Sequence, residues 1–110
     1  MSFTVNLYYS GKKGAARAFA EEMISSGTVE KIRNEEGNLK YDYFFPLDDP
    51  ETLLLIDSWA DQESLDRHHA SEMMKKIAEL REKYDLHTRV ERYREDDKYS
   101  SGKDEKYLRK

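Results

Sequence analysis

The amino-acid sequence predicts a single α+β domain in which four strands alternate with two helical regions. Three observations predict it: two runs in which apolar residues alternate, two amphipathic stretches of helical spacing, and a continuous apolar run before the second helical stretch. In chain order they give strand, helix, strand, strand, helix, strand. This βαββαβ order is typical of a ferredoxin-like fold, an antiparallel sheet with both helices on one face.

Length and composition restrict the classes of function. A chain of 110 residues is expected to form one domain, and its net charge of −4 argues against a nucleic-acid partner. The sequence has no cysteine, which excludes disulfides and thiolate chemistry and is typical of the reducing cytoplasm. No apolar run is long enough to cross a membrane, and the first residues do not resemble a signal peptide. We therefore expect a cytoplasmic protein without a membrane partner.

The first strand is predicted over residues 3–10, where side chains alternate with period two. Asn6 and Tyr8 fall on the face opposite Phe3, Val5 and Leu7. Asparagine is uncommon in strands, because its amide competes for backbone hydrogen bonds. Asn6 is therefore interpreted either as a solvent-facing polar residue or as an amide that faces a ligand beside Tyr8.

A helix is predicted after the turn at residues 11–14. Its apolar stripe at helical spacing consists of Ala16, Phe19, Ala20, Met23 and Ile24. Gly27 is placed to end this helix in the left-handed conformation, and Thr28 can cap a short second segment. We therefore expect the helix to be broken or bent near Gly27.

The clearest strand prediction covers residues 39–47, followed by a turn at residues 48–51 and a strand over residues 53–59. The first of these runs places five large side chains on one face: Leu39, Tyr41, Tyr43, Phe45 and Leu47. Residues 53–56 are continuously apolar, as expected of a strand covered on both faces. The two runs are close enough in sequence to form a hairpin.

Asp61 is expected to cap the second long helix. Its apolar stripe is predicted to run through Leu65, His69, Met73, Ile77, Leu80 and Tyr84. Ser71 is positioned to cap a second segment if the helix is interrupted there. A last strand is predicted over residues 86–93, which completes a domain of residues 1–94. Residues 95–110 form a charged tail that we expect to be disordered unless a partner orders it.

Large apolar side chains on both faces of the middle strands create a packing problem. Two helices on one face of the sheet would leave an apolar patch on the other face exposed to solvent. Packing two sheets face to face would bury that patch. The sequence therefore predicts a homodimer.

Two stretches carry a recognisable pattern. The stretch 35–44, EEGNLKYDYF, leads into a strand through acidic residues, a glycine and a tyrosine. The stretch 53–71, LLLIDSWADQESLDRHHAS, ends a strand with Asp57 and Trp59, and places His68 nine residues after the tryptophan and Ser71 three residues further on. With the element order over residues 2–94, these stretches resemble the antibiotic-biosynthesis-monooxygenase-like family of dimeric α+β barrels.

The resemblance implies a cofactor-independent monooxygenase, an oxidoreductase that acts on a small aromatic substrate such as a quinol or polyphenol. It implies no flavin, haem or metal, because the substrate anion itself reacts with oxygen. The protein would deprotonate the phenol, stabilise the anion and exclude water.

Six residues are candidates for this site. His68 is expected to take the phenolic proton, because histidine changes protonation near neutral pH. Asn6 and Tyr8 would donate hydrogen bonds to the developing oxyanion. The substrate ring would stack on aromatic side chains. The predicted set is therefore catalytic His68 and Asn6, with substrate-binding Trp59, Tyr8, Tyr43 and His69.

Several of these residues also have a purely structural interpretation. Trp59 can be a core residue at a strand end, and His68 can pack over Leu65 without any chemistry. Stripe spacing puts His69 nearer the buried side, so either histidine can face inward. Adjacent helical residues diverge by about 100°, so His68 and His69 do not form a metal site with His87.

The family also contains proteins with other activities. The haem-degrading members would require tryptophan at position 68 and histidine at position 78, where this chain has His68 and Ala78. Isomerases of the phosphorylated autoinducer-2 signal share the EEGNL stretch and the histidine, which leaves them as an alternative.

In that alternative, a lysine would bind the substrate phosphate: Lys12, Lys13 or Lys40.

Many family members carry a second histidine where this chain has Met73, a difference that argues against acid–base chemistry by a histidine pair. A third alternative is a non-catalytic dimeric ligand-binding module whose charged tail binds a partner.

Overall fold

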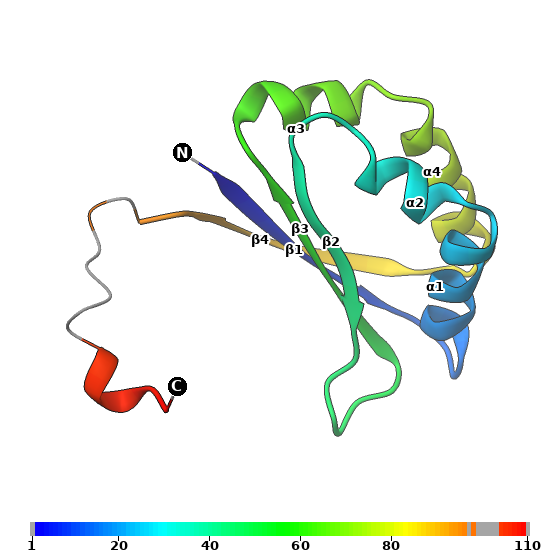
Figure 1. Cartoon of the computed structure of the whole chain (residues 1–110). Helices are drawn as coiled ribbons and strands as arrows, with labels where there is room; N and C mark the ends of the chain where they lie inside the picture. The colour runs from blue at the N-terminus through cyan, green and yellow to red at the C-terminus, as the bar shows by residue number, and fades with distance from the viewer. Residues whose placement is uncertain (1, 97, 99–103, 110) are drawn as a thin grey trace.

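A computed structural model describes residues 2–96, 98 and 104–109 of the chain. The strands are β1 (Phe3–Ser10), β2 (Asn38–Phe44), β3 (Thr52–Trp59) and β4 (His87–Arg94). The helices are α1 (Ala15–Ser25), α2 (Thr28–Arg33), α3 (Gln62–His69) and α4 (Met73–Lys83), with a 3-10 helix η2 (Glu105–Tyr107). The strands form one antiparallel sheet in the order β2-β3-β1-β4, and α1 to α4 cover one face (Figure 1). The predicted ferredoxin-like α+β fold and the β2–β3 hairpin are confirmed.

The strand register decides which side chains face the helices. Val5 lies between Asp57 of β3 and Arg92 of β4, and this row is on the helix side of the sheet. Asn6, one residue later, lies between Ile56 and Glu91. Since successive side chains in a strand point to opposite faces, the row of Asn6 belongs to the face without α-helices.

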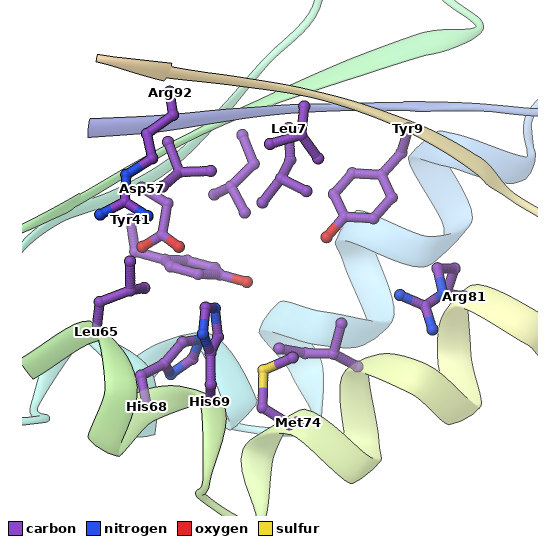
Figure 2. Close-up of a pocket in the computed structure, with 14 residues that line it drawn as sticks. Leu7, Tyr9, Tyr41, Asp57, Leu65, His68, His69, Met74, Arg81 and Arg92 are labelled. Atoms are coloured by element: carbon purple, nitrogen blue, oxygen red, sulfur yellow. The ribbon is translucent and has the colours of Figure 1, made fainter. Parts of the chain in front are cut away.

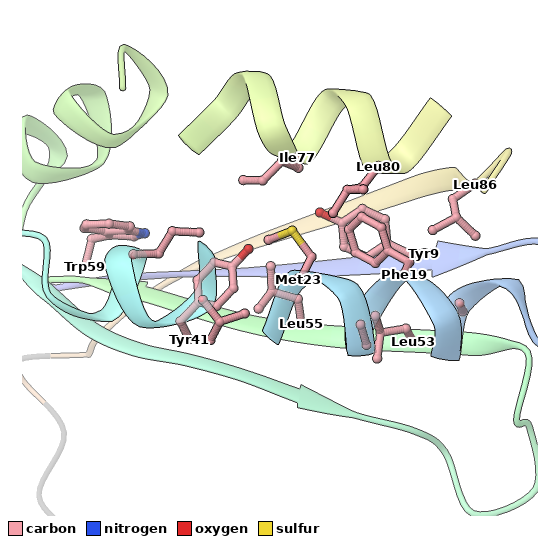
Figure 3. Close-up of a cluster of buried hydrophobic side chains, with 14 of the residues drawn as sticks. Tyr9, Phe19, Met23, Tyr41, Leu53, Leu55, Trp59, Ile77, Leu80 and Leu86 are labelled. Carbon is pink, nitrogen blue, oxygen red and sulfur yellow. The ribbon is translucent and has the colours of Figure 1, made fainter. Parts of the chain in front are cut away.

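The core fills the space between the sheet and the helices (Figure 3). Its largest fully buried side chains are Trp59, Tyr41, Phe19, Met23, Ile32, Leu53, Leu55 and Leu65. Burying each such side chain stabilises the fold by roughly 1.5–3 kcal/mol. Aromatic rings contribute further contacts, with Tyr9 and Phe19 centred 4.9 Å apart. The apolar face of α1 thus packs directly on the sheet.

Three apolar residues that were predicted to face inward are exposed: Ile24, Leu39 and Leu47. Leu39 falls where the β2–β3 register shifts, so a bulge turns it away from the core. Leu47 lies beyond β2, which ends at Phe44 rather than at residue 47. Ile24 is one residue, or about 100°, from the buried Met23 on α1, at the margin of its apolar stripe.

The second helical region is two helices separated by a break. Asp61 caps α3 as predicted, because its Oδ1 accepts a hydrogen bond from the Ser64 amide at 2.8 Å. The predicted stripe through His69 is wrong: His68 is buried and His69 is exposed. The break before α4 resets the helical phase, so one stripe does not run through both helices. Ser71 does not cap α4; its hydroxyl donates to the His68 carbonyl at 2.6 Å and closes α3.

Part of the predicted tail, residues 97, 99–103 and 110, lies outside the described residues. The described remainder of the tail contains η2. Within the described chain the longest helices, α1 and α4, have 11 residues each, and no helix is long and apolar enough to span a bilayer.

The turn before β2 docks against α3 through Gly37. Its carbonyl accepts a hydrogen bond from the Ala60 amide at 2.8 Å, and its φ is 85°. A Cβ atom on Gly37 would lie 2.0 Å from the Ser64 Oγ and 2.4 Å from the Ser64 Cβ. Only glycine therefore allows this close approach.

We expect Gly37→Ala to destabilise the protein by more than about 2 kcal/mol, because it combines a left-handed backbone with a steric clash. Gly27→Ala is the matched control: Gly27 has a φ of 80°, but a Cβ there meets nothing within 4 Å. The control should lose only about 1 kcal/mol. Urea unfolding measures both values, and equal losses would contradict the importance of the Gly37–Ser64 contact.

Candidate functional site

A cavity of about 290 Å³ lies between the helix-covered face of the sheet and the pair α3 and α4 (Figure 2). Apolar side chains form much of its wall: Val5, Leu7, Leu55, Leu65, Met74, Ile77 and Val90. Seven polar or aromatic side chains also line it: Tyr9, Tyr41, Asp57, His68, His69, Arg81 and Arg92. An apolar space with a few convergent polar groups is typical of a small-molecule site.

His68 is held from two sides inside this wall. Its Nδ1 lies 2.8 Å from Oε1 of Glu35, and only 3% of its surface is exposed. Its ring stacks on the Trp59 indole, with centroids 4.7 Å apart and planes at 29°. An ionised Glu35 can only accept at this contact, so Nδ1 carries the proton and donates it. In the neutral form of the imidazole, the second ring nitrogen, Nε2, then keeps a free lone pair.

Glu35 comes from the turn that follows α2 and is mostly buried. The docking of Gly37 on α3 brings this turn to His68, because only Glu36 separates Glu35 from Gly37 along the chain. Glu36 itself points outward, with 87% of its side chain exposed and its carboxylate 3.9 Å from Arg67. The EEGNL stretch therefore supplies one glutamate to the site and one to the surface.

Asp57 places a carboxyl group in the same cavity. It is 4% exposed, and its Oδ1 is buried without a hydrogen-bond partner. Burial raises the pKa of Asp57 to about 7, which the nearby Trp59 indole N–H opposes and the charge of Glu35 reinforces. The indole Nε1 is itself left without a partner of good hydrogen-bond geometry. Asp57 can therefore act as a proton donor or acceptor near neutral pH.

The rim of the cavity is more exposed. His69 is at the mouth, with its ring centroid 5.8 Å from that of His68. Partial burial lowers the pKa of His69, and the neighbouring His68 acts in the same direction. Arg92 of β4 donates a hydrogen bond to Gln62 of α3. This contact joins the strand and the helix that flank the mouth.

Two tyrosines line the interior. Burial raises the pKa of Tyr9 to about 12, and burial also raises the pKa of Tyr41. Both hydroxyls thus stay protonated at neutral pH and can donate hydrogen bonds to a ligand. The Tyr41 ring meets Tyr43 edge to face, with centroids 5.7 Å apart.

The structure brings only part of the predicted set to this cavity. His68 and His69 line it, whereas Trp59 is fully buried and supports the His68 ring from behind. Tyr43 is packed beside Tyr41 and Phe19 and is not in the cavity wall.

Asn6 and Tyr8 do not reach the cavity, because they lie on the opposite face of the sheet. Asn6 Oδ1 is nevertheless buried there without a hydrogen-bond partner. The expected oxyanion role for this pair therefore has no counterpart in the His68 cavity.

Sequence reasoning missed several residues of the site. Glu35 and Asp57 stood within the two recognised stretches, so their spacing could have found them. Arg81 and Arg92 carried no motif. Within the described residues, no group of three or more histidine and carboxylate side chains is arranged to hold a metal ion.

Comparison with known proteins places the fold. The family described as "Antibiotic biosynthesis monooxygenase" matches residues 2–80. The chain belongs to this family. No functionally curated protein matches the sequence significantly.

Solved structures agree with that family fold. A conserved protein from Methanosarcina mazei Go1 is 27% identical, with a TM-score of 0.75 over 87% of this chain and 94% of the other. The structure named "Putative antibiotic biosynthesis monooxygenase from Nitrosomonas europaea" is 20% identical, with a TM-score of 0.72 over 86% and 98%. A counterpart from Deinococcus radiodurans, named in the same terms, is 15% identical, with a TM-score of 0.73 over 91% and 97%. At these last two identities the likeness concerns the fold alone.

We expect Asp57→Asn to change how stability depends on pH. The unfolded chain ionises this carboxyl near its ordinary pKa of 3.8, whereas the folded protein keeps its proton up to about pH 7. Folding thus takes up a proton between these values, and stability falls as the pH rises through that window. Above it, the buried charge costs at most about 4 kcal/mol. Asp57→Asn should remove this loss and be more stable than the wild type at pH 8.

Urea unfolding at pH 4, 6 and 8 measures the effect, with Asp48→Asn as a control for the same charge change at an exposed position. The Asp57→Asn gain should grow from pH 4 to pH 8. A gain that is independent of pH would show that Asp57 is not held protonated by burial.

Proposed function

We propose that the protein is a cofactor-independent monooxygenase that oxidises a quinol or other polyphenol in this cavity. The observation that carries the proposal is the Glu35–His68 pair, a buried imidazole oriented by a carboxylate at the wall of an apolar space. A base that is oriented by a third group is the usual arrangement for activating a hydroxyl group. Membership of the antibiotic biosynthesis monooxygenase family supports the class of reaction.

The first step is proton transfer from the phenol to His68 Nε2. Glu35 fixes the tautomer that leaves Nε2 free, and it stabilises the imidazolium that forms. The stacked Trp59 holds the plane of the ring. The apolar wall excludes water, which strengthens this electrostatic stabilisation.

The phenolate then reacts with molecular oxygen. Oxygen bonds to a ring carbon that carries hydrogen, and the resulting hydroperoxide loses that hydrogen as a proton while its O–O bond breaks. One oxygen atom becomes a quinone carbonyl and the other leaves as water, with the substrate supplying all the electrons. Asp57, with a pKa of about 7, can protonate the departing oxygen.

The isomerase alternative has less support. Its expected phosphate partners, Lys12, Lys13 and Lys40, are not among the residues that line the cavity.

A chain without cysteine is compatible with a reducing compartment, and we propose that the enzyme works in the cytoplasm.

We expect His68→Ala to lower kcat/KM for a responsive quinol by about 10²–10⁴-fold, the usual range for loss of a general base. Glu35→Gln should lower it by about tenfold or more, because a neutral amide no longer stabilises the imidazolium. Glu36→Gln is the matched control, since Glu36 points to solvent. Oxygen uptake and quinone absorbance measure the rates across a panel of quinols and polyphenols.

If no compound in the panel causes oxygen uptake or quinone formation while phenols still bind, the protein is a non-catalytic binding module. A wild-type rate in His68→Ala would remove His68 from the chemistry.

We also propose that two copies pair through the face of the sheet that lacks α-helices. This face combines Leu54 and Ile56 with Phe44, whose surface is 43% exposed, and it contains the unpartnered amide oxygen of Asn6. A second copy would bury these apolar groups and could supply a donor for Asn6.

Sedimentation at micromolar concentration tests this pairing. The wild type should be a dimer, and Ile56→Lys should shift it towards monomer, because the interface would bury an unpaired charge. Ile24→Lys, at an exposed apolar position on α1, should remain dimeric. A monomeric wild type would refute the pairing.

A further inference from the structure

Arg81 is an unpaired cation in the wall of the cavity. It comes from the last turn of α4, is half-buried, and lines the cavity with its guanidinium turned inward (Figure 2). Within the described residues it forms no ion pair and no side-chain hydrogen bond. The neighbouring Lys83, in contrast, is paired with Glu22 at 2.8 Å on the outer side of the helix. A half-buried guanidinium without a partner is unfavourable, so a site that retains one has a use for its charge.

Tyr9 lies at the same end of the cavity as Arg81 (Figure 2). Tyr9 is 3% exposed and lines the cavity. The charge of Arg81 opposes the effect of burial on the Tyr9 pKa. Since burial keeps Tyr9 protonated, both side chains can donate hydrogen bonds to a ligand at this end of the cavity.

These donors stand apart from the proton-transfer end of the cavity. Figure 2 shows Arg81 and Tyr9 at one end, and Asp57 and Arg92 at the other. The space between them is apolar, with Leu7 and Ile77 in its wall. At the Asp57 end the charge of Arg92 is offset when Asp57 ionises, whereas the wall, within the described residues, has no carboxyl group at the Arg81 end, so an anion is favoured at Arg81. The cavity therefore has a direction for a ligand that carries a phenol at one end and an anion at the other.

We propose that Arg81, assisted by Tyr9, forms a subsite for a carboxylate carried by the aromatic substrate. The carboxylate would bind at Arg81 while the phenolic hydroxyl reaches His68, so the substrate class becomes a phenolic aromatic acid. The inference rests on the proposed function for the identity of the phenol end, but its anion recognition is a separate property.

A carboxylate suits this end better than a phosphate. The planar guanidinium matches a carboxylate with two parallel hydrogen bonds, and its single positive charge balances the single negative charge of the carboxylate. A phosphate dianion would call for a second cation beside Arg81, and Arg92 lies at the opposite end of the cavity.

Binding of two matched ligands tests the subsite without any turnover. The probes are 6-hydroxy-2-naphthoate and 6-hydroxy-2-naphthamide, which share size and phenol but differ in charge. For the wild type, titration calorimetry or naphthol fluorescence should give about tenfold tighter binding of the acid, and this preference should fall as salt is added. Arg81→Gln should reduce the acid to the affinity of the amide and leave amide binding unchanged.

Lys83→Gln is the matched control, because it removes the same charge from the same turn of α4 outside the cavity. It should keep the preference for the acid. Equal affinities for acid and amide in the wild type, absence of binding by both, or equal effects of Arg81→Gln and Lys83→Gln would each overturn the subsite. The wild-type comparison decides the matter even if a variant folds poorly. Loss of the acid preference with persistent oxygen uptake would refute the subsite alone, whereas acid-selective binding without oxygen uptake would refute only the oxygenase.

Discussion

The contact between His68 and Glu35 joins the two halves of the site. The residues are 33 positions apart, and their side chains meet only because the turn before β2 docks on α3. Gly37 permits that approach, and Trp59 closes the space behind the imidazole. Without this contact, a neutral His68 would have no fixed tautomer, and the proposed base would have no fixed orientation. The two recognised sequence stretches are therefore two surfaces of one contact, rather than two separate signals.

The site keeps polar groups in states that a purely structural core would avoid. Asp57 Oδ1 and Trp59 Nε1 are buried without partners, and Asp57 has a raised pKa as a result. Native cores seldom leave such groups unsatisfied, because each costs roughly 1–3 kcal/mol. An unsatisfied carboxyl with a raised pKa in a cavity wall is typical of a ligand-binding or proton-transfer group. The fold thus gives up stability at the same place where its chemistry would occur.

Much of the fold could be predicted because the spacing of apolar side chains along the sequence follows which side chains are buried. Alternation identified β1 and β2, and the continuous apolar run identified β3. The choice between His68 and His69 could not be made from the stripe, because the break after α3 changes the helical phase. Family spacing selected His68 where periodicity did not. Asn6 had the right residue type but the wrong strand parity, while Arg81 acquires its place only from the packing of α4 on the sheet.

The protonation of His68 is the feature on which the proposed chemistry depends most directly. A two-bond ¹H–¹⁵N NMR spectrum of the ¹⁵N-labelled protein at neutral pH reports which ring nitrogen carries the proton. We expect His68 in the Nδ1–H form, with an unprotonated Nε2 whose resonance shifts when a phenol is added. A His68 ring that is protonated at Nε2, or whose Nε2 resonance ignores the phenol, would contradict its role as the base in this cavity.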